Sequence, residues 1–196
     1  MDERIAYLIT DILSDPKARA PAFGEGSALD AGLPAAVKTG TTTEWRDNWT
    51  VGYTTRYVGG VGVGNADNEP MRGVSGVDGA APIWRGVIRA LHPTAPPGFS
   101  RPDGLVEIEV CAESGQLPGA ACTHRRRELF LQENVPTETC TLHGFITVDI
   151  ATGEPAGEDT PPEQRLVRRV TYWPADALAW VQEQGLPLPP PQAPVH

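Results

Sequence analysis

Four consecutive residues after an apolar run, Lys38, Thr39, Gly40 and Thr41, combine an amine, two hydroxyls and a position without a side chain. On a strand, Lys38 and Gly40 would face one side and Thr39 and Thr41 the other, unless the chain twists at the glycine. A second backbone can lie close to Gly40 because it has no Cβ. The candidate chemistry is acyl transfer, which requires a nucleophile, a base, oxyanion donors and a docking point for the substrate. Taken alone, the same residues also fit a strand that ends in a glycine turn with an exposed lysine.

Lys-Thr-Gly is one of three active-site motifs of penicillin-binding proteins and class A β-lactamases, and the residues around it extend the match. Residues 1–92 resemble the last part of the transpeptidase domain of class A (bifunctional) penicillin-binding proteins, with the 1C branch nearest. Residues 22–24, 46–54 and 63–68 carry this resemblance. It implies an α+β fold, in which a partial penicillin-binding/β-lactamase-like transpeptidase domain precedes a small β-rich tail domain.

In the family resembled, the strand with this motif lines the site that binds penicillin and cross-links cell-wall peptides. The resemblance implies that Lys38 supplies positive charge beside the nucleophile and that Thr39 hydrogen-bonds the substrate carboxylate. Gly40 would let the substrate backbone lie along the strand, and the N–H of Thr41 would donate to the oxyanion while its hydroxyl reaches the carboxylate. No cofactor is implied. The expected partners are a peptidoglycan stem peptide or a β-lactam, and the missing N-terminal part of the same protein, which would also be a glycosyltransferase.

The other two motifs of the family are not found in the sequence. Ser14 and Lys17 have the Ser-x-x-Lys spacing, but a nucleophile motif must open a helix so that the two side chains lie one turn apart. Here Ser14 is expected at a helix end, and Pro16 stands between the pair. The family also places its serine much further upstream, and no Ser-x-Asn occurs. We therefore expect this chain to be inactive alone.

The elements expected in residues 1–92 are a helix, three strands and a closing helix. Apolar residues at helical spacing predict a helix over 3–13, followed by a loop over 16–32. A strand is expected at 34–39, an antiparallel hairpin at 49–54 and 57–64, a polar loop at 65–79 and a helix at 80–91. Arg46 and Asp47 are interpreted as a paired corner, and Trp49 as a core residue.

The second half of the chain begins after a Pro-rich segment. Residues 93–104 are interpreted as a linker, 105–184 as a small β-rich domain and 185–196 as a Pro-rich tail. Strict alternation predicts a strand over 105–111, and weaker patterns predict strands over 128–131, 145–150 and 166–173. A short helix is expected over 176–184. No internal repeat is apparent in the sequence.

The expected β-rich domain over 105–184 has three cysteines and two histidines, at Cys111, Cys122, His124, Cys140 and His143. Zinc is one interpretation, because Cys140 and His143 are three residues apart, but Cys122-x-His124 is too short for the usual paired spacing. The resemblance implies an oxidising, extracytoplasmic location, which favours one disulfide. The first choice is Cys111 with Cys122, the second is Cys122 with Cys140, and no metal is expected.

Charge and composition limit the remaining classes of function. A net charge of −9 argues against a nucleic-acid partner, and the basic run 124–127 is interpreted as a solvated loop. No stretch has the length and apolar character of a membrane segment. As part of a membrane-anchored parent, the chain would lie in the periplasm or on the outer face of the cell membrane. The alternative function is a non-catalytic binding module of the cell envelope.

Overall fold

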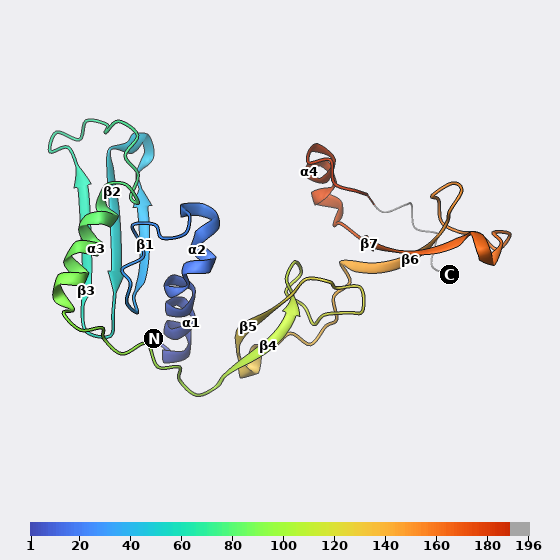
Figure 1. The fold of residues 1–196 in the computed structure, drawn as a ribbon, viewed down its shortest axis with the longest axis horizontal. Helices are drawn as coiled ribbons and strands as arrows, with labels where there is room; N and C mark the ends of the chain where they lie inside the picture. Colours follow the sequence, from blue (N-terminus) through green and yellow to red (C-terminus); the bar gives the residue numbers. More distant parts are fainter. Residues whose placement is uncertain (189–196) are drawn as a thin grey trace. The chain divides into compact units, whose positions relative to one another are not determined.

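The computed structural model describes residues 1–188 and divides the chain into two compact units, Met1–Gly104 and Leu105–His196 (Figure 1). Part of the expected Pro-rich tail, residues 189–196, lies outside the described residues. The described chain contains helices and purely antiparallel sheets, which confirms the α+β class. Residues 93–104, expected to be a linker, belong to the first unit: Phe99 contacts Tyr53 edge to face, and the hydroxyl of Thr55 donates to the Pro97 carbonyl.

The first unit contains the expected helix, strands and closing helix, with one addition. Its elements are α1 (Glu3–Ser14), α2 (Pro16–Phe23), β1 (Ala36–Thr41), the 3-10 turn η1 (Thr43–Trp45), β2 (Asp47–Tyr53), β3 (Val58–Gly64) and α3 (Ala80–Leu91). Helix α2 replaces part of the predicted loop at 16–32. The Asp15 carboxylate accepts from the Lys17 N–H, and Pro16 occupies the first turn, so these residues start a helix rather than a coil.

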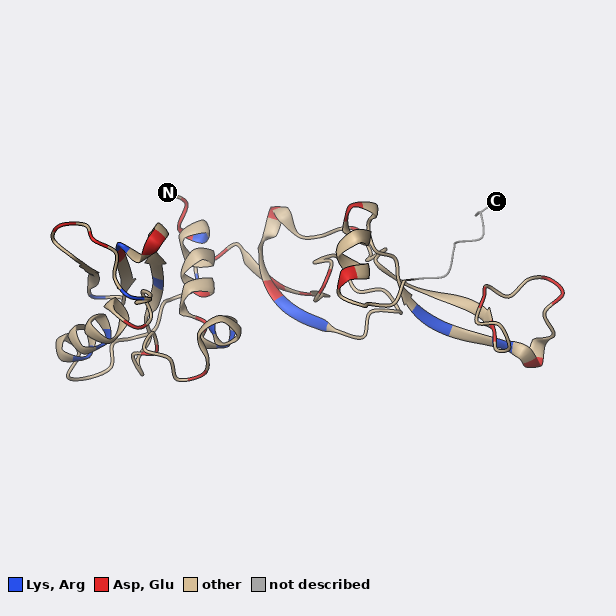
Figure 2. Ribbon diagram, turned by 90° about the horizontal axis from the view of Figure 1, so that it is seen from above, with Lys and Arg blue, Asp and Glu red and all other residues tan. Residues whose placement is uncertain are grey.

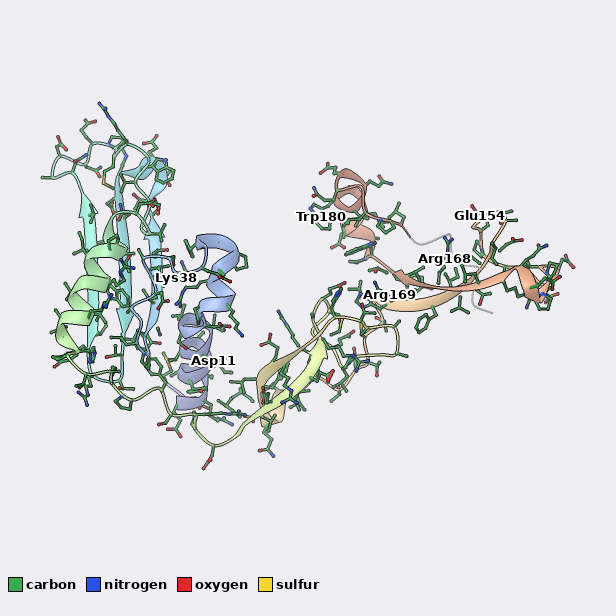
Figure 3. All side chains as sticks on the ribbon, viewed as in Figure 1. Asp11, Lys38, Glu154, Arg168, Arg169 and Trp180 are labelled. Atoms are coloured by element: carbon green, nitrogen blue, oxygen red, sulfur yellow. The ribbon has the colours of Figure 1, made fainter. Side chains whose placement is uncertain are left out.

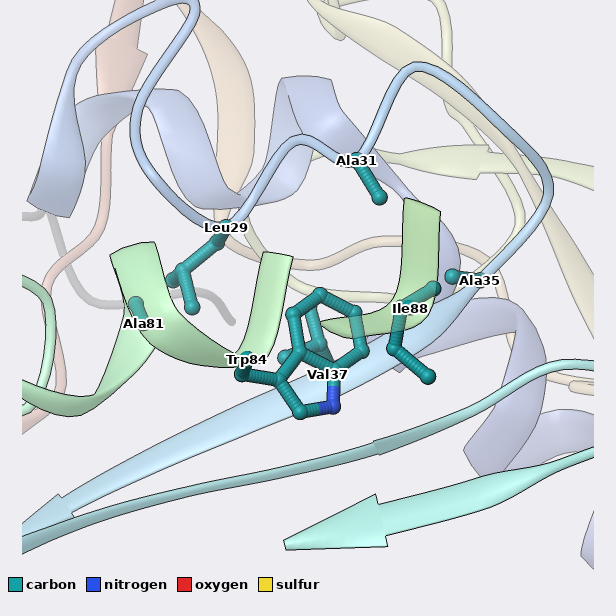
Figure 4. Close-up of a cluster of buried hydrophobic side chains, with 7 residues drawn as sticks. All are labelled: Leu29, Ala31, Ala35, Val37, Ala81, Trp84 and Ile88. Atoms are coloured by element: carbon teal, nitrogen blue, oxygen red, sulfur yellow. The ribbon is translucent and has the colours of Figure 1, made fainter. Parts of the chain in front are cut away.

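The three strands form an antiparallel sheet in the order β1-β2-β3, so β1 is paired on one side only. Helix α3 packs on one face of this sheet, where Trp84 and Ile88 are fully buried (Figure 4). They contact the buried side chains of Leu29, Ala31, Ala35, Val37 and Ala81. Because this core involves β1, the strand that carries Lys38 is held by packing at its amino-terminal end.

The opposite face of the sheet is largely uncovered. Trp49, predicted to be a core residue, is 51% exposed, and Val58 on the same face is 76% exposed. The pairing Trp49↔Gly62 and Tyr53↔Val58 places these side chains away from α3. Helix α1 likewise leaves Ile5, Ile9 and Ile12 exposed and buries Thr10 instead. The chain therefore presents apolar surface that an isolated domain normally covers.

The second unit consists of two antiparallel hairpins and a short helix. The first hairpin pairs β4 (Leu105–Cys111) with β5 (Arg125–Leu131), and the second pairs β6 (His143–Asp149) with β7 (Arg165–Thr171). Three 3-10 turns, η2 (Gln132–Asn134), η3 (Pro162–Gln164) and η4 (Ala175–Ala177), join or end them, and α4 (Leu178–Glu183) follows. The predicted helix over 176–184 thus divides into η4 and α4, and Trp180 of α4 contacts Trp173 edge to face.

The two hairpins are copies of one motif, contrary to the expectation of no repeat. β6 starts 38 residues after β4, and each strand is followed by a turn with a positive-φ glycine, Gly115 (φ 72°) or Gly153 (φ 76°). The Cys111 N–H donates to the Gln116 carbonyl at 2.8 Å, and the Asp149 N–H donates to the Glu154 carbonyl at 2.9 Å. Short sequence signals for the repeat are Ser-Gly-Gln at 114–116 and Thr-Gly-Glu at 152–154.

The basic run of the first hairpin forms part of a strand rather than the expected loop. β5 begins at Arg125, and in Figure 2 the blue of Lys and Arg covers part of this strand. Its three arginines each lie within 4 Å of a glutamate, in the pairs Arg125–Glu109, Arg126–Glu128 and Arg127–Glu107. Carboxylates therefore balance the positive charge locally, and no basic surface for phosphate recognition results.

Candidate functional site

The Lys-Thr-Gly residues lie in the exposed half of β1. Lys38 pairs with Val51, Thr39 with Thr50, Gly40 with Trp49 and Thr41 with Asn48. Opposed residues share a face, so Lys38 and Gly40 lie on the uncovered face and the two threonines on the face of α3. One face of the strand thus carries the amine and the open glycine position, and the other carries the two hydroxyls, as side-chain alternation predicts.

Lys38 is an exposed amine held close to its own strand. Its Nζ donates to the carbonyl of Thr39 at 2.6 Å, and Figure 3 labels it on β1. Nothing lies within 4 Å of the position that a Cβ would occupy on Gly40. β1 therefore has open space over Gly40 beside a cationic side chain, and one of its edges is not paired with another strand.

The threonine row contacts the segment that leads into α3. The Gly76 N–H donates to Thr41 Oγ1 at 3.1 Å, and Thr50 Oγ1 donates to the Gly76 carbonyl at 3.1 Å. A Cβ on Gly76 would come within 2.9 Å of the Thr39 Cβ, so only glycine fits there. The bond to Thr41 uses a lone pair of its oxygen and leaves the hydroxyl proton able to donate. The sequence interpretation missed Gly76, because its partners are 26 to 37 residues away.

A strained turn follows the motif. Glu44 (φ 60°) and Trp45 (φ 59°) have left-handed backbone conformations, which are uncommon outside glycine. The Arg46 guanidinium donates to Glu44 Oε2 at 2.6 Å and to the Asn68 carbonyl at 2.8 Å. The expected Arg46–Asp47 pair is therefore replaced by Arg46–Glu44, while Asp47 accepts from Trp49 Nε1 at 2.9 Å. These bonds hold the exposed turn beside the motif.

Ser14 is not placed as a nucleophile. It is the last residue of α1, its hydroxyl donates to the Asp11 carbonyl, and Lys17 lies in α2 beyond the break at Asp15. A cavity of about 330 Å³ lies beside Ser14, lined by Tyr7, Thr10, Asp11, Arg19, Leu29 and Phe99, among others. None of the Lys-Thr-Gly residues lines this cavity, so the serine and the motif do not share a site.

The second unit gathers all three cysteines with a histidine. Cys111, Cys122 and Cys140 are buried free thiols, so the expected disulfide between Cys111 and Cys122 is not formed. The four ligand atoms of these cysteines and His143 lie within 4.8 Å of one another. The physical reason for the difference is that the sulfur atoms all face the His143 ring rather than one another in a single pair.

The titration of these groups reflects their burial and their hydrogen bonds. Burial raises the pKa of the Cys140 thiol, but hydrogen bonds from Ser114 and His143 outweigh it and bring this pKa down to about 6. At Cys122, burial and the contact with Cys140 raise the pKa to about 11. For His143, burial lowers the pKa, whereas the hydrogen bonds with Cys140 and Glu113 raise it above its usual value overall.

Comparisons with known proteins agree on one family. A family model described as Penicillin-binding protein 1A, C-terminal domain, matches residues 101–145. Penicillin-binding protein 1A of Clostridium tetani is 29% identical over 150 residues, which cover 73% of this chain and 19% of the relative. Penicillin-binding protein 1C of Escherichia coli is 33% identical over 130 residues, which cover 65% of this chain and 16% of the relative.

A solved structure supports the same relationship. The crystal structure of penicillin-binding protein 1A from Haemophilus influenzae matches with a TM-score of 0.59 and 25% identity, over 71% of this chain and 22% of that chain. The chain thus spans about a fifth of the length of the relatives that it matches. Relatives of both the 1A and the 1C type occur, so these matches do not separate the two branches. Within residues 1–188, no helix has both the length and the apolar character needed to cross a bilayer.

Proposed function

The chain corresponds to the C-terminal part of a class A penicillin-binding protein, and we propose that it supplies the Lys-Thr-Gly side of a D,D-transpeptidase active site. The observation that carries this proposal is the geometry of β1, where an exposed lysine and an open glycine lie on a strand paired on one side only. In the complete protein the site would bind penicillin and cross-link peptidoglycan stem peptides.

Each residue of the motif has a distinct proposed role. Lys38 provides positive charge beside the serine nucleophile and stabilises negative charge during its attack. The backbone of Gly40 accommodates the substrate main chain, because nothing occupies the space of its missing Cβ. The Thr41 N–H donates to the oxyanion. The hydroxyls of Thr39 and Thr41 hydrogen-bond the substrate carboxylate, which must reach past the edge of β1 to the α3 face, where the pairing places both side chains.

The nucleophile must come from another part of the parent protein. Ser14 ends a helix and is separated from Lys17 by a break, so the geometry that lets lysine activate serine does not occur there. The apolar surfaces of α1 and of the open sheet face are the surfaces on which the remainder of the domain would pack. The parent, a membrane-anchored enzyme that also polymerises glycan, would expose this chain outside the cytoplasm.

The test uses the full-length protein that carries this segment. A fluorescent penicillin should label that protein at one serine upstream of the segment, and Lys38→Ala should slow the labelling. Labelling of wild type and Lys38→Ala at equal rates would refute the role of β1. If the full-length protein takes no label at all, the alternative of a non-catalytic envelope module becomes the better account.

A further inference from the structure

The cysteine cluster of the second unit is built from three separate segments of chain. Cys111 ends β4, Cys122 lies in the loop before β5, and Cys140 and His143 flank the start of β6. All four side chains are buried. The geometry points to a structural zinc site with these four residues as ligands, and this inference does not depend on the acyl-transfer proposal.

The distances within the cluster match tetrahedral coordination. His143 Nδ1 lies 3.5 Å from Cys111 Sγ, 3.6 Å from Cys122 Sγ and 3.5 Å from Cys140 Sγ. Zinc–sulfur bonds of about 2.3 Å and zinc–nitrogen bonds of about 2.0–2.1 Å at tetrahedral angles separate sulfur and nitrogen by about 3.6 Å. One ring nitrogen has a single lone pair or a single N–H, so hydrogen bonding alone does not account for three equal contacts.

A carboxylate orients the histidine for this role. His143 Nε2 lies 2.8 Å from Glu113 Oε2. A carboxylate accepts the Nε2–H, which leaves the lone pair of Nδ1 directed at the three thiols. Zinc-ligating histidines almost always donate their second N–H to such an acceptor. Glu113 is therefore a positioning residue that fixes the tautomer.

The three cysteines also form the buried cluster around which this unit packs, and Leu142 packs against it as a partly buried neighbour. Apart from the cysteines, the described part of this unit buries five apolar side chains, Leu105, Val110, Ala121, Val148 and Val181. Small domains that bury so little apolar surface are commonly held by a metal or a disulfide. Three thiols and one imidazole with no open position are the donor set of structural zinc.

The second hairpin shows that its turn does not require cysteine. At the positions equivalent to Cys111 and Cys122, 38 residues later, it has Asp149 and Thr160. The turn nevertheless forms the same backbone hydrogen bonds, including Gly153 N–H to the Asp149 carbonyl at 2.7 Å. The cysteines of the first copy therefore serve something other than turn geometry, and metal binding explains why all of them point to one place.

The decisive experiment measures metal and thiols on the full 196-residue chain, produced in zinc-containing medium without added metal-affinity resin. We expect about one zinc per chain, a mass equal to that of the fully reduced protein plus zinc under native conditions, and three reactive thiols after denaturation with a chelator. Replacing zinc with Co(II) should give the intense visible absorption of tetrahedral cobalt–thiolate coordination.

Variants identify the ligands. Cys140→Ser and His143→Ala should each lose zinc at stoichiometric supply, and Glu113→Gln should keep the site but bind zinc about 10–100-fold more weakly. His124→Ala is the matched control, because His124 is near Cys122 in sequence but its side chain is 74% exposed; it should bind zinc like the wild type. Zinc loss in His124→Ala that equals the loss in His143→Ala would overturn the ligand assignment.

Two results on the wild type would overturn the site itself. One is a mass lower by two hydrogens with one reactive thiol, which would mean a disulfide with one cysteine left over. The other is a reduced chain that binds neither zinc nor Co(II) and shows no cobalt–thiolate absorption. Both are read on the unmodified chain, so they decide the question even if a cysteine variant fails to fold.

Discussion

The indole of Trp84 lies directly against Gly52, across the boundary between α3 and the sheet. A Cβ on Gly52 would overlap the Trp84 ring at Cζ2 and come within 2.8 Å of the Ala36 carbonyl oxygen. Trp84 is 1% exposed and is the largest fully buried side chain described. The close approach of α3 to β2, next to the strand that carries Lys38, thus depends on the absence of one side chain.

Gly52→Ala should destabilise the chain by about 1–3 kcal/mol, because the added methyl group displaces Trp84 from a filled core. Gly86→Ala is the matched control: nothing lies within 4 Å of the new Cβ, and the position is in the interior of α3. That variant should be more stable by about 0.5–1 kcal/mol. Urea denaturation followed by circular dichroism measures both, and equal destabilisation would contradict the packing argument.

The isolated chain should form no stable acyl adduct with a penicillin. Ser14 is the serine of the one Ser-x-x-Lys in the sequence. Its hydroxyl donates a hydrogen bond to the Asp11 carbonyl at the end of α1, where no lysine is placed to activate it. Intact mass after incubation with a labelled penicillin measures the outcome. A stoichiometric mass increase that Ser14→Ala abolishes would show that the serine acts after all.

In the full-length protein, Lys38→Ala should slow acylation by at least ~100-fold, the scale of losing one oriented electrostatic contact. The melting temperature should change little, because the Lys38 side chain is exposed and packs against little. Lys17→Ala is the control, since this lysine lies in α2 and should leave the rate unchanged. A large fall in melting temperature for Lys38→Ala would indicate a structural role instead.

The uncovered face of the sheet should make the isolated chain associate. Val58→Lys adds charge to that face and should reduce association, as measured by analytical ultracentrifugation, without lowering the melting temperature. The matched control is Val61→Lys, three residues along the same strand, because Val61 packs against the core cluster beneath α3. That variant should lose stability. A monomeric wild type with a midpoint well above the ordinary range of about 45–65 °C would contradict this prediction.

The sequence was sufficient to predict elements in which local pattern and burial agree. Helix α3 and strand β4 have the predicted bounds, 80–91 and 105–111, since each has a clear period and turn residues at its ends. Helix α2 was missed because its start depends on capping by Asp15, a local bond that hydrophobic periodicity does not register. Trp49 was wrongly assigned to the core because its burial requires a partner surface that this chain does not supply.

More of the Lys-Thr-Gly site than of the cysteine cluster could be predicted from the sequence. Strand alternation predicted that Lys38 and Gly40 share one face and Thr39 and Thr41 the other, but the strand expected over 34–39 extends to Thr41. The contact of Thr41 with Gly76 could not be predicted, because the two residues are 35 positions apart. For the cysteines, the spacing argued against zinc, and the extracytoplasmic location implied by the family resemblance favoured a disulfide. Cys111 and His143 are 32 residues apart, and only the stacking of one hairpin turn on the start of the next brings them together.

The tandem hairpins also predict an order of opening. Both have the same backbone hydrogen bonds at the turn, but the turn of the first contributes Cys111 and Cys122 to the buried cysteine cluster. The second joins that cluster only at its start, and it exposes Phe145, Leu166 and Val167 along its strands. Amide protons of β7 should therefore exchange with solvent at lower free energy than those of β4. One copy of the duplicated motif would then open locally more easily than the other, and the cause would be the side chains rather than the backbone geometry.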